Sequence, residues 1–355
     1  MDLDDLAAWQ YELPEELIAS RPAPQRDESR LMVVRRRNQS IEHHQIKDLP
    51  NLLNEDDRLV FNNTKVLPAR LFGFRTSTRG KWEGLFLNQE SEGCWRITGQ
   101  TRGRLAAGET LTLTVAGSDP VAERYDGVEL ALREKLPDGT WLVQPQSSES
   151  TVDLLQQYGT LPLPPYIGRK IADDDDNVRY QTVYAKNAGA IAAPTAGLHF
   201  TPELLKECLE RGIARSEVTL HVGIGTFRPV NADRLSEHEM HSEWCQLDDR
   251  TADEIKTTKQ TGGNIVAVGT TSVRTLEAAA AQTTGPWQGD TELFIRPGFE
   301  FRSVDQLLTN FHLPGSTLIV LVAALAGYDL TMKAYREAVA ERYRFYSYGD
   351  AMLIL

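Results

Sequence analysis

The feature of this 355-residue sequence that most constrains its fold is a change of hydrophobic pattern along the chain. Between about residues 70 and 146, short runs that alternate apolar and polar residues, such as RLFGFRT and ETLTLTVAG, are separated by Gly, Asp and Ser. This pattern is typical of short strands joined by turns. It predicts an all-β unit, either a small barrel or a sandwich.

The flanking segments have a different pattern. Residues 1–65 contain a helix candidate at residues 14–20 and two strand candidates, RLMVVRR and RLVFNNTKV. From about residue 150 onward, strand and helix candidates alternate, as in NIVAVG followed by TTSVRTLEAAAA and TELFIRPG followed by VDQLL. Such alternation is typical of an α/β domain. We therefore expect an α/β domain formed by residues 1–65 and 150–355, with an inserted β domain at residues 66–149.

Cysteine usage and hydropathy bound the class of protein. The three cysteines form no CxxC pair, which suits a reducing compartment better than a disulfide framework or a zinc site. The first residues, MDLDDLAAW, lack the basic and apolar regions of a signal peptide. The longest apolar run, residues 318–326, is too short to cross a bilayer. We expect a cytoplasmic protein with no membrane partner and no metal.

The charge is unevenly distributed. The chain has a formal net charge of -12, yet residues 65–110 carry eight Lys or Arg against four Glu, a net charge of +4. Arg102 and Arg104 lie in this segment, and Arg169 with Lys170 could extend its surface. Local positive charge of this kind suits RNA phosphates, although a merely solvated basic face fits the charge pattern equally well.

Histidines and hydroxyl residues recur where strand candidates end. His199 follows the run AGAIAAP and precedes a helix start at Thr201, and alone it would more often be structural than functional. His221, His312 and the segment GTTSVR occupy equivalent positions after other strand candidates. If those strands are parallel, the groups gather at one edge, where α/β proteins bind ligands. This clustering favours a shared site.

The segment GTTSVR predicts an anion site. It offers backbone N–H groups at a helix start, the hydroxyls of Thr270, Thr271 and Ser272, and the guanidinium of Arg274. These groups suit a carboxylate or a phosphate. Familiar alternatives are missing, because there is no GxxxxGK[ST] or GxSxG, the pair Gly223 and Gly225 lacks a third glycine, and HEMH at residues 238–241 has the wrong spacing for HExxH.

Two functional interpretations remain open on these features alone. One is an enzyme acting on a polar, partly anionic small molecule that could be attached to RNA. The other is a non-catalytic RNA-binding protein that uses its β insert. Several histidines beside an anion site favour the enzyme.

The motifs also resemble a known family. They are LPEELIASRPAPQRDESRLMVV, VFNNTKVLPARLFG, GTLPLPPYI, RYQTVYA, GAIAAPTAGLHFT, TLHVGIGTFRPV, HSEWCQL, VAVGTTSVRTLE and TNFHLPGSTL. Together they cover nearly the whole chain in order. They resemble the S-adenosylmethionine:tRNA ribosyltransferase-isomerase family of queuosine biosynthesis.

The resemblance implies an activity. The ribosyl group of S-adenosylmethionine is transferred and isomerised onto a 7-aminomethyl-7-deazaguanine base at the wobble position of tRNA, which gives epoxyqueuosine and releases adenine and methionine. It implies S-adenosylmethionine and tRNA as partners and no other cofactor. It also implies a barrel-like catalytic α/β domain with a small β-barrel insert.

Roles for individual residues follow from this chemistry. His199, His221 and His312 are the acid or base candidates, and Thr270, Thr271, Ser272 and Arg274 are the candidates for the methionine carboxylate. Glu243 in HSEWCQL is a candidate to face the sulfonium and amino group. Arg102, Arg104, Arg169 and Lys170 are expected to contact tRNA.

Overall fold

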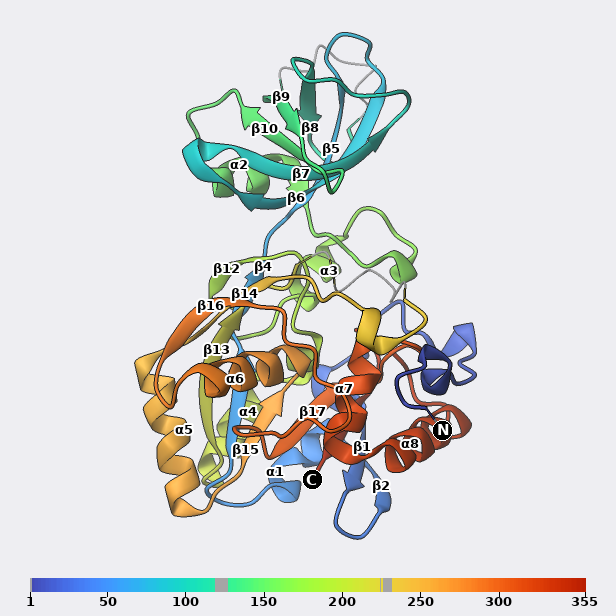
Figure 1. Ribbon diagram of the computed structural model, residues 1–355, viewed down its shortest axis with the longest axis vertical. Helices are drawn as coiled ribbons and strands as arrows, with labels where there is room; N and C mark the ends of the chain where they lie inside the picture. The colour runs from blue at the N-terminus through green and yellow to red at the C-terminus, as the bar shows by residue number, and fades with distance from the viewer. Residues whose placement is uncertain (1, 119–126, 224, 226–231) are drawn as a thin grey trace. The chain divides into compact units, whose positions relative to one another are not determined.

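The computed structural model describes residues 2–118, 127–223, 225 and 232–355, and the chain divides into two compact units (Figure 1). The first, here called the α/β unit, comprises residues 1–65, 179–187 and 193–355. The second, the barrel unit, comprises residues 66–178 and 188–192. Part of the motif TLHVGIGTFRPV, residues 224 and 226–230, lies outside the described residues.

A nine-stranded mixed sheet forms the centre of the α/β unit. Its strands, in spatial order, are β16 (Trp287–Thr291), β14 (Glu243–Leu247), β13 (Ala214–Leu220), β3 (Arg58–Asn62), β15 (Ile265–Val268), β17 (Gln306–Asn310), β18 (Ala351–Ile354), β1 (Arg30–Arg35) and β2 (Ser40–Gln45). The four neighbours β13, β3, β15 and β17 are parallel, so their carboxyl ends meet at one edge. No pairing joins β16 to β2 in the described chain, so this sheet is open and not a closed barrel.

Helices cover both faces of this sheet (Figure 1). They are α1 (Leu49–Leu52), α4 (Pro202–Glu210), α5 (Asp249–Thr261), α6 (Thr270–Gln282), α7 (Thr317–Ala326) and α8 (Tyr328–Ala340). Short 3₁₀ turns span Leu6–Trp9, Glu15–Leu17, Arg26–Glu28, Ile46–Asp48, Thr195–His199 and Leu235–Glu237. The helix expected at residues 14–20 is therefore only one short turn, because Ile18 leaves helical geometry and Ala19 bonds to Phe345.

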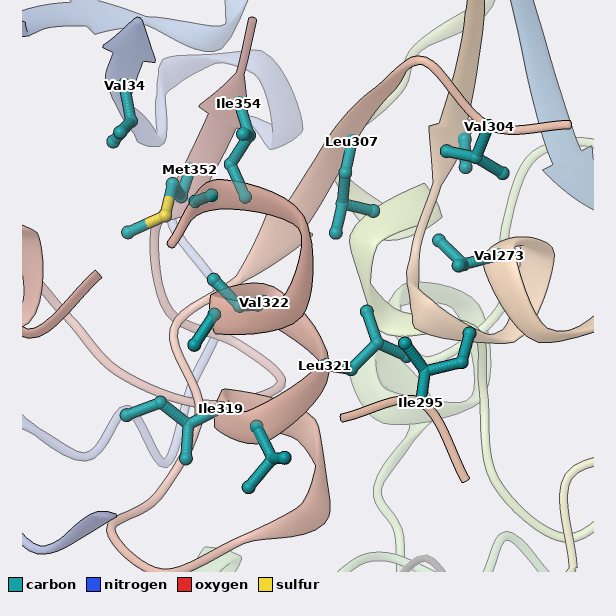
Figure 2. Packing of buried hydrophobic residues seen from close by; sticks show 14 of the residues in the cluster. Val34, Val273, Ile295, Val304, Leu307, Ile319, Leu321, Val322, Met352 and Ile354 are labelled. Carbon is teal, nitrogen blue, oxygen red and sulfur yellow. The ribbon is translucent and has the colours of Figure 1, made fainter. Parts of the chain in front are cut away.

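Two buried apolar clusters lie on the opposite faces of the sheet. Along β1, Met32 and Val34 belong to one cluster, whereas Leu31 and Val33 belong to the other. This division follows from the alternation of side chains along a strand. Figure 2 shows the first cluster, where side chains of α7 pack with those of the sheet strands.

Helix α7 is apolar on nearly all sides because it is a core helix. No single helix in the described ranges is long and apolar enough to cross a membrane. Helices α7 and α8 reach that length and composition only together, and they are bent by 119° at Gly327.

Strand β18 lies between β17 and β1, so it is the link through which β1 and β2 join the sheet. Asp350 comes just before it and is buried. Its carboxylate accepts hydrogen bonds from the backbone N–H groups of Arg30 and Arg344.

The barrel unit confirms the predicted small barrel. Its strands are β5 (Arg70–Arg75), β6 (Lys81–Gln89), β7 (Trp95–Thr101), β10 (Trp141–Pro145), β9 (Glu129–Lys135) and β8 (Thr110–Thr114), and pairing of β5 with β8 closes the barrel. Gly73 is required at this closure, since a Cβ there would lie 2.3 Å from the carbonyl oxygen of Thr112.

The barrel unit reaches further along the chain than the expected insert at residues 66–149. Helix α2 (Thr151–Tyr158) packs Leu154 and Leu155 into the barrel core, and β11 (Gly159–Thr160) pairs with β5. The other elements are 3₁₀ turns at Ser91–Gly93 and Pro165–Ile167, the helix α3 (Asp174–Arg179), and two short strands where the chain passes between units, β4 (Thr64–Val66) and β12 (Asn187–Ala190).

Candidate active site

The carboxyl ends of the parallel strands bring the predicted segments together within the α/β unit. Asn310, the last residue of β17, bonds to His199 in the turn Thr195–His199. Ala196 of that turn packs close to Gly269 at the start of α6, because a Cβ added to Gly269 would lie 3.5 Å from the Ala196 Cβ. Asn62 at the end of β3 donates hydrogen bonds to the Leu220 carbonyl oxygen at 3.0 Å and to Thr271 Oγ1 at 3.2 Å. These strand ends therefore bring together a cluster of polar groups.

His221 is the most accessible ring of this cluster. Its Nδ1 lies 2.8 Å from Thr64 Oγ1, and its ring is stacked on Trp244 with centroids 5.2 Å apart. Half-burial lowers the pKa of His221 below its ordinary value of 6.5. Among the residues that the structure describes, no group bonds to its Nε2. A neutral imidazole with one free nitrogen can accept or donate a proton.

His199 is held more tightly. Its Nε2 accepts a hydrogen bond of 3.2 Å from Asn310 Nδ2, and a second bond joins the ring to the backbone of Arg26. Because Nε2 is already an acceptor, Nδ1–H makes the bond to Arg26. Burial lowers the pKa of His199 to about 4, so the ring is neutral at pH 7. Both nitrogens are occupied, which favours a structural role.

A small pocket of about 20 Å³ borders His199, enough for about one water molecule. Its lining residues are Pro22, Ala23, Arg26, Ser29, Arg179, Leu198, His199, Ser347, Tyr348 and Gly349. Arg26 donates to the carbonyl oxygens of Leu198 and Gln181, each at 2.9 Å, and Arg179 donates to those of Ala23 and Pro24. The arginines therefore hold the pocket walls together.

His312 is buried inside the fold. Its ring Nε2 lies 3.0 Å from Thr309 Oγ1. Its backbone N–H donates to the Tyr335 hydroxyl, and its backbone carbonyl oxygen accepts from the Tyr11 hydroxyl. Burial lowers its pKa to about 3. These contacts favour a structural role over the predicted acid or base role.

The start of α6 retains part of its predicted binding capacity. Thr271 Oγ1 accepts from Asn62, and Ser272 Oγ donates to the Val268 carbonyl oxygen, so two predicted hydroxyls are engaged by the fold. Thr270 is buried. The N-cap is Gly269, with φ 87°, and no side chain caps the first turn. The N–H groups of the first turn therefore have no side-chain partner in the described chain and are available to an anion.

Arg274 and Glu243 bind each other. Arg274 Nη1 and Glu243 Oε2 form an ion pair, with only 8% and 6% of the two side chains exposed. Arg274 also donates to the carbonyl oxygens of Leu293 and Thr291, and Glu243 accepts from the Gly223 N–H at 2.8 Å. This argues against Arg274 as the partner of a substrate carboxylate and against Glu243 as an exposed group facing a sulfonium, because burial forces the two charges to neutralise each other.

The four basic residues predicted to contact tRNA all lie in the barrel unit but differ in their surroundings. Arg169 forms ion pairs with Asp173 and the buried Asp176, and Lys170 pairs with Glu83 at 2.9 Å. Arg102 and Arg104 are exposed in the loop after β7, without an ion pair inside the described chain.

Lys81 adds a positive charge to this part of the barrel surface. It is exposed at the start of β6, where the neighbouring Trp82 pairs with Thr101 of β7. Lys81, Arg102 and Arg104, here called the basic end of the barrel, are exposed and form no ion pair with the residues that the structure describes. Arg75 and Arg96 differ, because they pair with Glu109 and Asp138.

Sequence reasoning missed the uncharged polar residues of the site. Thr64, Asn62 and Asn310 orient the histidines and the start of α6, and Trp244 stacks on His221. A usable signal was present, because Asn62 and Asn310 are each the last residue of a buried strand. In the described part of the chain, no group of three or more His, Cys, Asp or Glu could hold a metal ion.

The fold and the site define an α/β enzyme with an inserted small β-barrel, in which polar groups gather at the carboxyl ends of parallel strands. The model of one family, described as queuosine biosynthesis protein, matches residues 6–354. The chain belongs to this family, as its motifs predicted.

Relatives with curated names agree with this assignment. A protein of Pelobacter propionicus is 48% identical over 351 residues, which are 98% of each chain, and one of Staphylococcus saprophyticus is 45% identical over 99% of this chain and 100% of its own. Both are named S-adenosylmethionine:tRNA ribosyltransferase-isomerase. The solved structure of an S-adenosylmethionine tRNA ribosyltransferase from Thermotoga maritima is 36% identical, covers 98% of this chain and 100% of its own, and has a TM-score of 0.55.

Proposed function

We propose that this enzyme transfers and isomerises the ribosyl moiety of S-adenosylmethionine to the 7-aminomethyl-7-deazaguanine base at the wobble position of tRNA. The product is epoxyqueuosine-tRNA, and adenine and methionine are released. The observation that carries the proposal is the match to the family over residues 6–354, together with relatives of that enzyme name over nearly the full length.

His221 is the proposed acid or base. The sulfonium of S-adenosylmethionine acidifies the hydrogens on the adjacent ribose carbon, so a neutral base can start the reaction. A lowered pKa keeps His221 neutral at pH 7, and no group in the described ranges bonds to its Nε2. His199 and His312 lack this combination, since both are buried.

The start of α6 is the proposed binding site of the methionine carboxylate. Its uncapped N–H groups and the positive end of the helix dipole suit an anion without a charged side chain. Thr271 supports this position because Asn62 links it to the strand end that precedes His221.

The basic end of the barrel is the proposed contact for tRNA phosphates. The chain as a whole carries a charge of -12, so attachment to RNA must rely on a local positive surface. Lys81, Arg102 and Arg104 provide such a surface, and contacts of this kind position RNA without reading its sequence.

Adenine release tests the whole proposal. The purified enzyme is expected to release adenine from S-adenosylmethionine with tRNA that carries the modified base, and not with the same tRNA carrying guanine. A matched reaction with His221→Ala controls for spontaneous breakdown of S-adenosylmethionine. Methyl transfer to the tRNA, or adenine release that is independent of the modified base, would contradict the assignment.

A further inference from the structure

Thr64 lies at a junction of two hydrogen bonds. It is fully buried at the start of β4, directly after the strand end that carries Asn62 and Asn63. Its Oγ1 lies 2.8 Å from His221 Nδ1 and 3.4 Å from the carbonyl oxygen of Asn187. All three groups belong to the α/β unit.

The direction of these hydrogen bonds follows from the chemistry of the groups. A carbonyl oxygen can only accept, and a threonine hydroxyl has a single proton. When both bonds are made, the hydroxyl proton of Thr64 goes to the Asn187 carbonyl oxygen. Oγ1 is then left to accept, so Nδ1 of His221 must carry the ring proton.

Strand β14 holds both the backbone and the ring of His221. The backbone N–H of His221 donates to the Trp244 carbonyl oxygen at 3.0 Å, and the Trp244 indole lies nearly parallel to the imidazole, at 20°. Stacking fixes the plane of the ring, and Thr64 fixes its rotation within that plane. Among the residues that the structure describes, Nε2 is the ring nitrogen left without a partner.

We infer that Thr64 is a positioning residue that holds His221 in the Nδ1–H tautomer and thereby presents the Nε2 lone pair as the base. The inference deepens the proposed function and rests on it for the role of His221. Its structural part, the tautomer of His221, does not depend on which reaction the enzyme catalyses. Hydrogen-bonded partners of this kind set the tautomer of functional histidines in general.

Two substitutions at Thr64 separate the hydroxyl from the volume of the side chain. Thr64→Val keeps the shape but removes the hydroxyl, whereas Thr64→Ser keeps the hydroxyl. Thr219→Val is a matched control, because the buried Thr219 hydroxyl bonds to Asn63 and Asn187 in the same network without contacting His221. His221→Gln identifies the His221 signals.

The first readout is ¹⁵N NMR of the histidine rings in the enzyme without substrates. In the wild type, Thr64→Ser and Thr219→Val, the protonated nitrogen of neutral His221 is expected to be Nδ1. In Thr64→Val the signal is expected to move toward a mixture of tautomers. A wild-type ring protonated at Nε2, or a Thr64→Val ring that keeps the wild-type tautomer, would overturn the inference.

The second readout is turnover. Thr64→Val is expected to lower kcat by about 10- to 100-fold, the usual effect of removing a group that orients a functional histidine. The KM for S-adenosylmethionine should be little changed, and Thr64→Ser should recover most of the rate. Equal rates for Thr64→Val and the wild type would contradict the positioning role. Full activity of His221→Gln would instead reject His221 as the base, while the NMR result still decides the tautomer.

Discussion

Asn310 and His199 are joined by a hydrogen bond in which the Asn310 amide Nδ2 donates to His199 Nε2 across 3.2 Å. This bond distinguishes His199, which lies in the turn after the short strand β12, from His221, which directly follows β13 of the nine-stranded sheet. His199 has both nitrogens engaged and is buried, whereas no described residue bonds to Nε2 of His221. The two histidines should therefore respond differently to substitution.

His199 should make stability depend on pH. Its pKa is about 4 in the folded protein and near 6.5 in the unfolded chain. Between these values the unfolded chain binds a proton that the folded protein does not, so the stabilisation is complete above pH 6.5 and is lost as the pH falls toward 4. The full shift corresponds to roughly 3 kcal/mol. We expect the Tm of His199→Gln to fall less than that of the wild type when the pH is lowered from about 7.5 to about 5. His44→Gln is the surface control and should follow the wild type. Identical pH dependence in all three proteins would contradict this prediction.

His221 should affect rate more than stability. We expect His221→Ala to lower kcat by roughly 100-fold or more, as for a lost acid or base, with little change in Tm. His44→Gln, on the edge strand β2 and six strands from β13 in the order of the sheet, should keep its rate. A near-normal rate for His221→Ala would show that this ring serves only the fold. Burial lowers the pKa of His221, so in a plot of kcat/KM against pH the midpoint of the acid limb should lie below the ordinary histidine pKa of 6.5.

The pair of Arg274 and Glu243 should behave as a buried ion pair. Removing one partner, as in Arg274→Met or Glu243→Gln, leaves the other charge buried and should destabilise the protein by about 3 to 5 kcal/mol. The double variant Arg274→Met with Glu243→Gln should recover much of this loss. Denaturant unfolding of the four proteins measures the coupling. If Arg274→Met keeps wild-type stability but raises the KM for S-adenosylmethionine, the guanidinium binds substrate after all.

The basic end of the barrel should dominate the salt dependence of tRNA binding. Replacing Arg102 and Arg104 together by Ala should weaken binding and reduce the slope of log Kd against log salt by roughly 0.7 to 0.9 for each lost phosphate contact. Arg96→Ala is the matched control, since Asp138 already neutralises Arg96 in the same unit. Binding of S-adenosylmethionine should be unchanged. An unaltered slope in the double variant would place the RNA elsewhere.

The sequence predicted the barrel and the α/β alternation because both patterns are local. It was wrong for VDQLL, which was expected to be a helix and forms much of β17. This run is short and apolar, and periodicity cannot separate a buried strand from a helix over five residues. Its assignment depends on the neighbouring strands β15 and β18, which lie elsewhere in the chain.

The sequence predicted which segments form the candidate site, but not which partners their side chains have. Strand-end positions predicted that the segments around His199, His221 and Thr270 would meet. They could not reveal that Arg274 is neutralised by Glu243, because that ion pair joins α6 to a strand 31 residues away. Nor could they rank the histidines, whose difference lies in burial and in partners such as Asn310 and Thr64.

The position of β18 also dictates when the protein can fold. Arg30 at the start of β1 and Asp350 just before β18 are 320 residues apart in the chain, and yet they bond to each other. Since a ribosome releases β1 and β2 first, this hairpin has no sheet to join until the last strand has emerged. The barrel unit, whose strands are contiguous in the chain, is free to close much earlier. Nascent chains of this enzyme can thus complete the barrel before the sheet, and any factor that shelters them has the apolar strand β1 to cover until β18 has emerged.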